Sequence, residues 1–172
     1  MNLYKKILLI TTNPIEATQI IIHRLNHWYW GKCMDSKRIK HGQAFTFIQP
    51  VYLNAPGTGT IQFGDKLSLN HNVTIDAGGG GKIHIGDGVQ IGMNSVLRAS
   101  NHDYVKGEGH IRGHIYVGNN VWIGANCVVL PNVILGTGCV IGAGSIVTKD
   151  MPAGWVCFGN PCMKRWEIKR CV

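Results

Sequence analysis

The fold is decided by residues 117–147, which read VGNNVW IGANCV VLPNVI LGTGCV IGAGSI V when divided into groups of six. The first position of each group is aliphatic, and the second is usually glycine. The fourth position is always Asn or Gly, the residues that most readily adopt a positive φ angle, so the chain should turn a corner once per group. The fifth position is small or β-branched, as the inside of a tight corner requires. A six-residue period with a turn in every unit predicts a β-helix solenoid whose first-position side chains face the interior.

The same period extends towards the N-terminus. Groups of six begin at Phe63, Leu69 and Ile75, and they resume at Ile85 and Ile91. The glycine run 78–81 between them adds four residues, which we interpret as a bulged corner. It is not a phosphate-binding loop, because no Gly-Lys-Ser/Thr follows it and no helix begins there. Residues 41–60 are irregular and are compatible with a degenerate first coil.

These patterns predict an all-β chain in three parts. Residues 1–60 form an N-terminal cap and an irregular first coil. Residues 61–152 form the hexapeptide β-helix, from which residues 99–116 are ejected as a loop. Residues 153–172 form a C-terminal strand, expected over 156–158, and a basic tail, whose residues 164–170 are compatible with a short helix.

A helix is predicted after residue 12, because Asn13 suits an N-cap and Pro14 suits the first helical position. Apolar residues then recur at helical spacing up to Tyr29, and Gly31 is a plausible end. One interpretation is a helix that covers the open end of the solenoid and hides its strand edges. The alternative is contact with a membrane surface through the aromatic residues at 28–30 and the neighbouring basic residues.

The composition restricts the possible partners. The net charge of +8 is concentrated at the two ends of the chain, since residues 61–152 carry six basic and six acidic residues. We therefore expect anionic groups to be met at the ends, and no nucleic-acid stripe along the body. No signal-peptide core and no apolar stretch of about 20 residues is present. The six cysteines should accordingly stay reduced in the cytoplasm, with Cys127 and Cys139 as small interior fillers.

The segment 99–116 is the most polar and histidine-rich part of the body, and loops ejected from rigid scaffolds often carry function. His102 is a candidate general base, because an imidazole has an unperturbed pKa of about 6.5 and can accept a proton near neutral pH. Asp103 could orient that imidazole, although an adjacent residue is expected to point away. Glu108, His110 and His114 either line an acceptor pocket or are solvated.

The repeats, the Asn101-His102-Asp103 loop, the Gly124-Ala125-Asn126 corner, the segment 141–150 and Gly159-Asn160-Pro161 together resemble the hexapeptide-repeat acyltransferases. The resemblance covers residues 60–166 and is greatest to the maltose/galactoside and polysaccharide O-acetyltransferase branch. It implies a left-handed parallel β-helix, an exception to the usual right-handed crossover. It also implies a homotrimer that binds acetyl-CoA, as acyl donor, in the groove between two subunits, with no metal.

The resemblance also assigns site residues. His102 matches the catalytic histidine of the family, and Asn70 matches an asparagine that helps to position the acceptor. Residues near the donor are Ala125 and Ala143 beside the pantetheine arm, and Thr148, Lys149, Lys164 and Arg165 towards the adenosine-phosphate end. Met163 and Trp166 stand where relatives carry Arg, so the cations are shifted in register.

The function implied is acetyl-CoA-dependent O-acetylation of a saccharide hydroxyl in an envelope or capsular polysaccharide or its precursor, in the cytoplasm or at a membrane surface. One alternative is N-acetylation of a nucleotide-linked amino sugar. An alternative of another class is a metalloenzyme like the γ-class carbonic anhydrases, with His102, His110 and His114 as zinc ligands. A non-catalytic scaffold that has kept the coil is the third.

Overall fold

The computed structural model describes residues 38–44, 46–48 and 50–169. By its internal contacts the chain divides into two compact units, Met1–Lys37 and Arg38–Val172. The predicted N-terminal helix and the aromatic residues considered for membrane contact lie outside the described residues. Among the described residues there is no helix long and apolar enough to cross a membrane.

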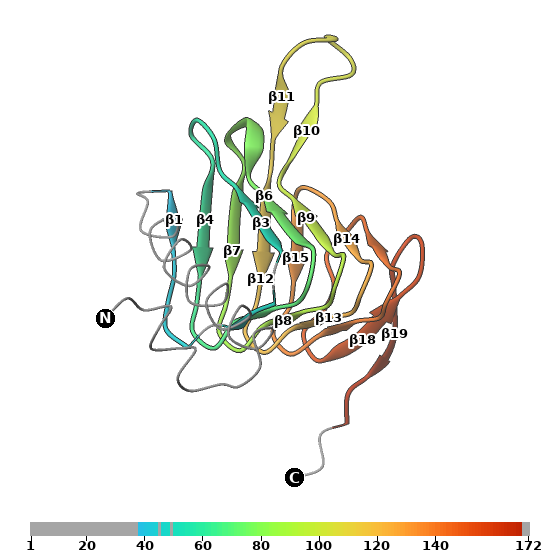
Figure 1. The fold of residues 1–172 in the computed structure, drawn as a ribbon. Coiled ribbons are helices and arrows are strands. Elements are labelled where there is room, and N and C mark those ends of the chain that lie inside the picture. Colours follow the sequence, from blue (N-terminus) through green and yellow to red (C-terminus); the bar gives the residue numbers. More distant parts are fainter. Residues whose placement is uncertain (1–37, 45, 49, 170–172) are drawn as a thin grey trace, which may run out of the picture. The chain divides into compact units, whose positions relative to one another are not determined.

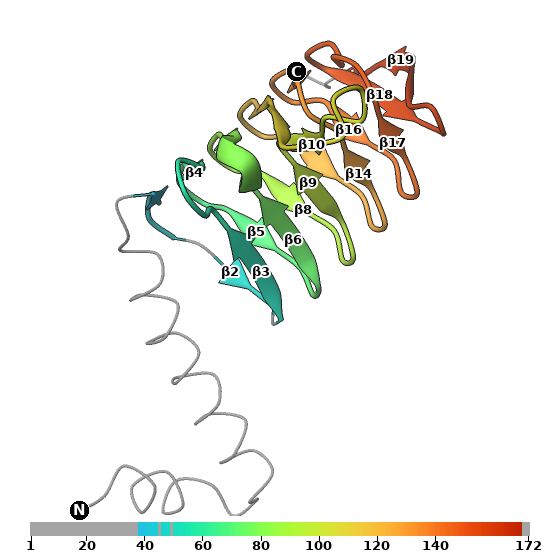
Figure 2. The same ribbon diagram turned by 90° about the horizontal axis from the view of Figure 1, so that it is seen from above.

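The described chain winds through three sheets in turn, as Figures 1 and 2 show, and their strands are parallel except for β19 in sheet B. Sheet A contains β1 (Ile39–Lys40), β4 (Thr60–Phe63), β7 (Lys82–Ile85), β12 (His114–Val117) and β15 (Val133–Leu135). Sheet B contains β2 (Thr46–Phe47), β5 (Ser68–Leu69), β8 (Gln90–Ile91), β13 (Trp122–Ile123), β16 (Val140–Ile141), β18 (Trp155–Phe158) and β19 (Met163–Glu167). Sheet C contains β3 (Val51–Asn54), β6 (Val73–Asp76), β9 (Val96–Arg98), β14 (Val128–Val129) and β17 (Ile146–Val147). The parallel β-helix predicted from the sequence is confirmed.

The interior is a set of aliphatic columns, one for each sheet. In sheet A, Ile61 pairs with Ile83, which pairs with Ile115, which pairs with Val133. All four side chains are buried, as are the first-position residues of every group between 117 and 147. The fifth-position residues are buried as well, including Cys127 and Cys139. Each coil therefore buries its apolar side chains in one shared interior, against one another and against the coils above and below.

The corners of the coils explain why the fourth position of each group is Asn or Gly. Positive φ angles occur at Asn72, Asn94, Asn120, Asn126, Asn132, Gly138 and Gly144. Lys66 and Ala44 adopt the same conformation at corners of the first coils, without the residue type that would have revealed it. Strands β1, β2 and β3 pair in parallel with β4, β5 and β6, so the irregular segment 41–60 is indeed a coil.

Coil length varies at one corner, between sheet C and sheet A. Ile115 pairs with Val133, an offset of 18 residues, which is three groups of six. Ile61 pairs with Ile83, an offset of 22, and the extra residues form the 3-10 turn η1 (Gly78–Gly80). Ile83 pairs with Ile115, an offset of 32, and here the chain leaves the coil as an antiparallel hairpin of β10 (Ser100–His102) and β11 (His110–Arg112). The bulged corner at the glycine run is therefore confirmed.

Two predicted boundaries are wrong. The ejected loop ends at Gly113 and not at 116, because β12 begins at His114 and buries Ile115 in the core. The basic tail is not a helix: β19 runs antiparallel to β18, which is consequently not the last strand. Pairing with the free edge of β18 outweighs the weak helical preference of a short charged segment.

The four described cysteines are free and buried. Burial raises the pKa of the Cys139 thiol to about 12, helped by the neighbouring Cys157 and Cys162. Burial likewise raises the pKa of the Cys162 thiol to about 11. Such thiols stay protonated at neutral pH and pack as small apolar side chains, as predicted for Cys127 and Cys139.

Candidate functional site

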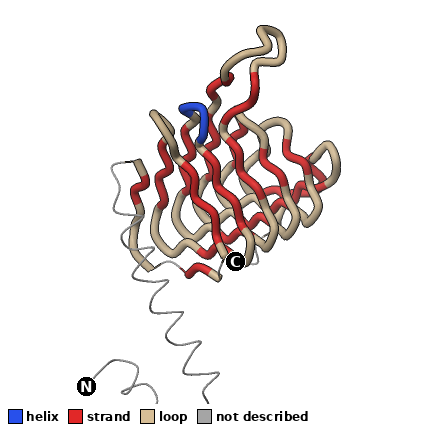
Figure 3. The backbone as a smooth tube through the Cα atoms, turned by 45° about the horizontal axis from the view of Figure 1, so that its top comes forward, coloured by secondary structure: helices blue, strands red, loops and turns tan. Residues whose placement is uncertain are grey.

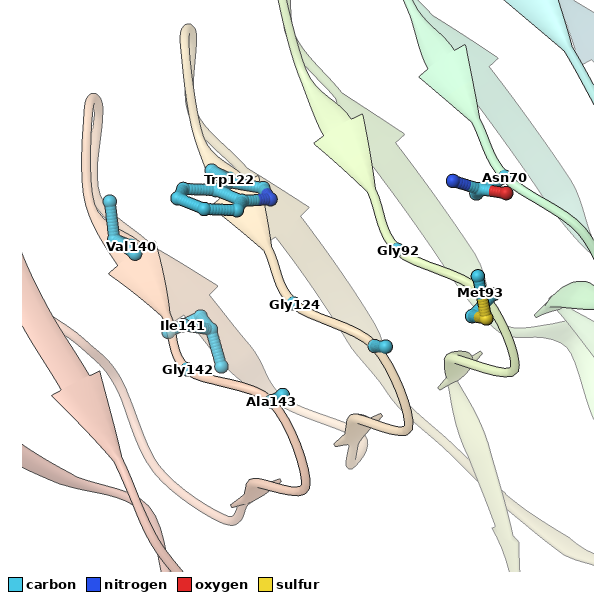
Figure 4. A pocket seen from close by; sticks show the side chains of 10 residues that line it. Asn70, Gly92, Met93, Trp122, Gly124, Val140, Ile141, Gly142 and Ala143 are labelled. Atoms are coloured by element: carbon cyan, nitrogen blue, oxygen red, sulfur yellow. The ribbon is translucent and has the colours of Figure 1, made fainter.

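A groove of about 370 Å³ runs across the outer face of sheet B to the corner where the chain enters sheet C (Figure 4). It is lined by Asn70, Gly92, Met93, Trp122, Gly124, Ala125, Val140, Ile141, Gly142 and Ala143. Three residues assigned from the sequence, Asn70, Ala125 and Ala143, thus lie in one groove although they come from three different coils, with the coil of Gly92 and Met93 between Asn70 and Ala125. We call this the sheet B groove.

The glycines of the sheet B groove are required by the approach of successive coils. A Cβ atom on Gly92 would lie 2.6 Å from the backbone nitrogen of Ala125. A Cβ atom on Gly124 would lie 2.6 Å from the backbone nitrogen of Ala143. Both distances are shorter than a carbon atom can tolerate, so the second-position glycines set the floor of the groove. No hydrogen-bond partner of the Ala125 or Ala143 N–H lies among the described residues, which leaves both donors available along the groove.

At the other end of the groove, Asn70 presents its amide. The Asn70 Oδ1 atom accepts a hydrogen bond of 2.7 Å from the backbone N–H of His71, which fixes the orientation of the side chain. In Figure 4 the nitrogen atoms of the Asn70 amide and the Trp122 indole both turn towards the strand that carries Gly92. Two N–H donors therefore converge on this part of the groove.

His102 lies elsewhere, on the hairpin. Its side chain is exposed, and its ring contacts the ring of His110 edge to face, with the centroids 4.6 Å apart. The backbone N–H of His102 donates to Asn101 Oδ1 at 3.0 Å. The two histidines are cross-strand partners at the last paired position before the hairpin tip. The imidazole is thus held by a ring contact while it remains accessible.

Asp103 shapes the hairpin tip. Its Oδ1 atom accepts hydrogen bonds from the backbone N–H groups of Val105 and Lys106, at 3.1 and 3.0 Å. These contacts give it a turn-forming role, typical of an Asp that caps the residues following it. An orienting role towards the His102 imidazole stays a prediction, for which these contacts offer no support.

The predicted cation cluster divides into two parts. Lys149 and Lys164 line a common pocket of about 490 Å³, together with Asp150, Met151, Pro152 and Met163. Arg165 instead turns back on its own sheet: its guanidinium lies 4.6 Å from the centroid of the Phe158 ring and donates to the Phe158 carbonyl. Thr148 is exposed beside Lys149. The Lys164 Nζ atom also lies 5.2 Å from the centroid of the Trp155 ring. The two lysines thus share a pocket, whereas the guanidinium of Arg165 is held by both a ring and a carbonyl.

Within one chain the two halves of the predicted site do not meet. The hairpin that carries His102 leaves the corner between sheets C and A, whereas the sheet B groove ends at the corner between sheets B and C. Figure 1 shows the hairpin of β10 and β11 at the opposite side of the coil from β8 and β13. His102 and Asn70 can act on one substrate only if a second chain brings them together.

The zinc alternative needs His102, His110 and His114 to converge. In residues 38–169, apart from the two undescribed positions, no group of three His, Cys, Asp or Glu side chains is arranged to hold a metal ion. His102 and His110 contact each other, whereas His114 begins the coil strand β12. The backbone N–H of His114 donates to Asn132 Oδ1 on the next coil. His114 therefore lies on the coil and not in the ejected loop, apart from the pair formed by His102 and His110.

Sequence reasoning missed Trp122 and Met93. Both line the sheet B groove, and they are 56% and 46% exposed. The sequence does mark Trp122 as unusual. It is the only aromatic residue at the sixth position of the groups in residues 117–146, where the other groups carry Val or Ile. Large aromatic side chains exposed in a groove commonly mark a binding surface.

Comparison with known proteins shows the family to which this chain belongs. The family model described as bacterial transferase hexapeptide (six repeats) matches residues 114–149. A galactoside acetyltransferase solved in complex with coenzyme A is 36% identical, with a TM-score of 0.69, over 76% of this chain and 65% of that one. A hexapeptide-repeat acetyltransferase from Vibrio cholerae O1 biovar eltor, solved with acetyl coenzyme A, is 30% identical, with a TM-score of 0.68, over 76% and 72%. The chain belongs to the hexapeptide-repeat acetyltransferase family.

More distant structures share the fold. A maltose O-acetyltransferase from Clostridium difficile 630 is 24% identical, with a TM-score of 0.66, over 97% of this chain and 85% of that one. A search among curated protein sequences gave no match. The match to the galactoside acetyltransferase spans slightly less than two thirds of that protein, so its activity passes to this chain only as a proposal.

Proposed function

We propose that this protein transfers the acetyl group of acetyl-CoA to a hydroxyl of a saccharide. The observation that carries the proposal is the sheet B groove, in which Asn70, Ala125 and Ala143 line one cavity of about 370 Å³. Membership of the acetyltransferase family and the coenzyme A complexes of the two relatives above support the same donor.

The groove suits the donor in shape and polarity. Its floor is backbone, because glycines remove the side chains, so a narrow pantetheine arm can approach closely. The Ala125 and Ala143 N–H groups then donate to the amide carbonyls of that arm. Lys149 and Lys164 lie where the coil ends and supply positive charge for the phosphates of the nucleotide.

His102 is the proposed general base. Its imidazole removes the proton of the acceptor hydroxyl as the oxygen attacks the thioester carbonyl. The tetrahedral intermediate then collapses, the C–S bond breaks, and the imidazolium returns the proton to the leaving thiolate of coenzyme A. Such proton transfer is worth roughly 10²- to 10⁴-fold in rate. A nearby N–H, such as that of the Asn70 amide, stabilises the developing negative charge or holds the acceptor.

This chemistry requires more than one chain. Since His102 and the sheet B groove lie at different corners, we propose a homotrimer in which the hairpin of one subunit completes the groove of its neighbour. The outward side chains of sheet C form a ladder of Thr74 and the apolar Val96, Val128 and Ile146, which suits an interface between subunits. Cytoplasmic location, with contact to a membrane surface through the N-terminal segment, belongs to the same proposal.

The decisive experiment supplies acetyl-CoA and a panel of saccharides and follows thiol release. We expect turnover that depends on the acceptor, and a product whose acetate is released by mild alkali, since that is the behaviour of an ester. Alkali-stable acetate on the best substrate would replace this proposal with N-acetylation of an amino sugar. Absence of turnover with both hydroxyl and amine acceptors would favour the non-catalytic scaffold.

A further inference from the structure

The hairpin that carries His102 rests on the coil below it at a position where only glycine fits. Figure 3 shows the 3-10 turn η1 beside the base of the hairpin, and η1 contacts both β10 and β11. A Cβ atom on Gly79 would lie 2.6 Å from Cδ2 and 2.7 Å from Cβ of His110. The Cβ, Cγ and Cδ2 atoms of His110 therefore pack directly on the backbone of Gly79.

Several contacts hold η1 in this position. The Gly78 N–H donates to Asp76 Oδ1 at 2.8 Å, and the Asn54 amide donates to the same oxygen at 2.9 Å. The other carboxylate oxygen of Asp76 lies 3.7 Å from Arg98 Nε. Asp76 thus connects three successive coils at the corner that supports the hairpin. The platform is fixed by the coil and does not depend on the hairpin tip.

His110 in turn contacts His102. The two rings meet edge to face with the centroids 4.6 Å apart and the planes at 89°. An edge-to-face contact of this kind favours one orientation of each ring. Within the described part of the chain, the other interactions of His102 are those of its backbone.

We propose that His110 is a positioning residue, which rests on Gly79 and holds the His102 imidazole in the orientation needed for proton transfer. This inference rests on the proposed function for its catalytic consequence, although the ring contact can be tested without activity. On this proposal, the glycine run 78–81 affects catalysis indirectly, because it supports the hairpin residue His110.

The first test changes the ring. His110→Ala should lower kcat by about 2- to 12-fold, the factor that corresponds to an aromatic pair of about 0.5–1.5 kcal/mol. The KM for acetyl-CoA should not change, because the sheet B groove is untouched. His110→Phe keeps an aromatic ring at the contact and should restore most of kcat. The matched control is His84→Ala, which removes a ring stacked on Tyr116 on the outer face of sheet A and should leave kcat unchanged.

The second test changes the platform. Gly79→Ala inserts a methyl group against His110 and should lower kcat as His110→Ala does, and the two changes together should cost little more than either alone. Gly57→Ala is the matched control: Gly57 has nearly the same φ, +62° against +64° at Gly79, but no atom lies within 4 Å of the added carbon. It reproduces the backbone strain without the contact.

The third readout is independent of activity. The imidazole NMR signals of His102 should move in His110→Ala and Gly79→Ala, and should stay in place in the two controls. Unmoved signals, a Phe variant as slow as the Ala variant, or additive losses in the double variant would each overturn the inference. If the wild-type protein shows no acetyl transfer, the proposed function fails, and the NMR comparison still decides whether His110 positions His102.

Discussion

The pocket formed by Lys149 and Lys164 gives a quantitative test of donor binding. We consider Lys149→Gln and Lys164→Gln, singly and together. Both lysines are exposed, so each ion pair with a phosphate contributes only about 0.2–1 kcal/mol, as is usual for exposed pairs. The double change should raise the Kd of acetyl-CoA by about 2- to 30-fold, and each single change by about 1.5- to 5-fold.

The structure also predicts how Arg165 differs from the lysines. Its guanidinium is held by the Phe158 ring and carbonyl, so Arg165→Gln should change the Kd by less than either lysine substitution. Lys82→Gln, on the exposed face of strand β7 in sheet A, is the control for net charge alone, and it should have no effect on the Kd.

Isothermal titration calorimetry with acetyl-CoA at about 50 and 500 mM salt measures these effects. Salt at the higher concentration shortens the screening length to about 4 Å, so it should weaken binding to the wild type more than to the double variant. An unchanged Kd in the double variant would remove this pocket from the donor site. A larger effect of Arg165→Gln than of both lysines would show that the guanidinium leaves Phe158 to bind the phosphates.

Three further outcomes are expected. His102→Ala should lower kcat by about 100-fold or more while the Kd of acetyl-CoA stays constant, and retention of a tenth of kcat would argue against a general base. Trp122→Ala should change the KM of donor or acceptor, with its far-ultraviolet circular dichroism unchanged, because the indole is exposed in the sheet B groove; unaltered kinetics would exclude it from the site. Burial raises the pKa of the Cys139 thiol in the folded state to about 12, so the thiol of the unfolded chain loses its proton at a lower pH. The contribution of Cys139 to the free energy of unfolding is therefore fully present below about pH 9 and is lost as the pH rises towards 12. The slope is about 1.4 kcal/mol per pH unit, and Cys139→Ala should flatten it in urea titrations between pH 8 and 10.5; an equally steep profile would contradict the cause assigned.

The coil could be predicted because its constraint is local and repeated. A corner that needs positive φ selects Asn or Gly, and a floor where coils approach within contact distance selects Gly, so both requirements are visible in the sequence. The first coil was less clear, since Ala44 and Lys66 adopt positive φ at their corners without the expected residue type.

The parts that were missed depend on contacts distant in sequence. The sequence predicts residues 114–116 as part of the loop because nothing before them marks a corner, yet Ile115 pairs with Ile83 and Val133 in the core. The tail became a strand because β18 offered a free edge. The separation of His102 from Asn70 follows from which corner carries the insertion, and the six-residue period alone does not specify that.

The ends of the hairpin excursion are joined to each other. The Gly113 N–H donates to the Ala99 carbonyl at 2.8 Å, so the chain leaves and re-enters the coil at almost the same point. The pairing of successive coils therefore does not depend on the length or sequence of the segment between these two residues. Segments of other lengths and compositions can be exchanged there without disturbing the sheet B groove of the same chain. This corner is the natural place for the protein to acquire a new acceptor, by replacement of a single surface module.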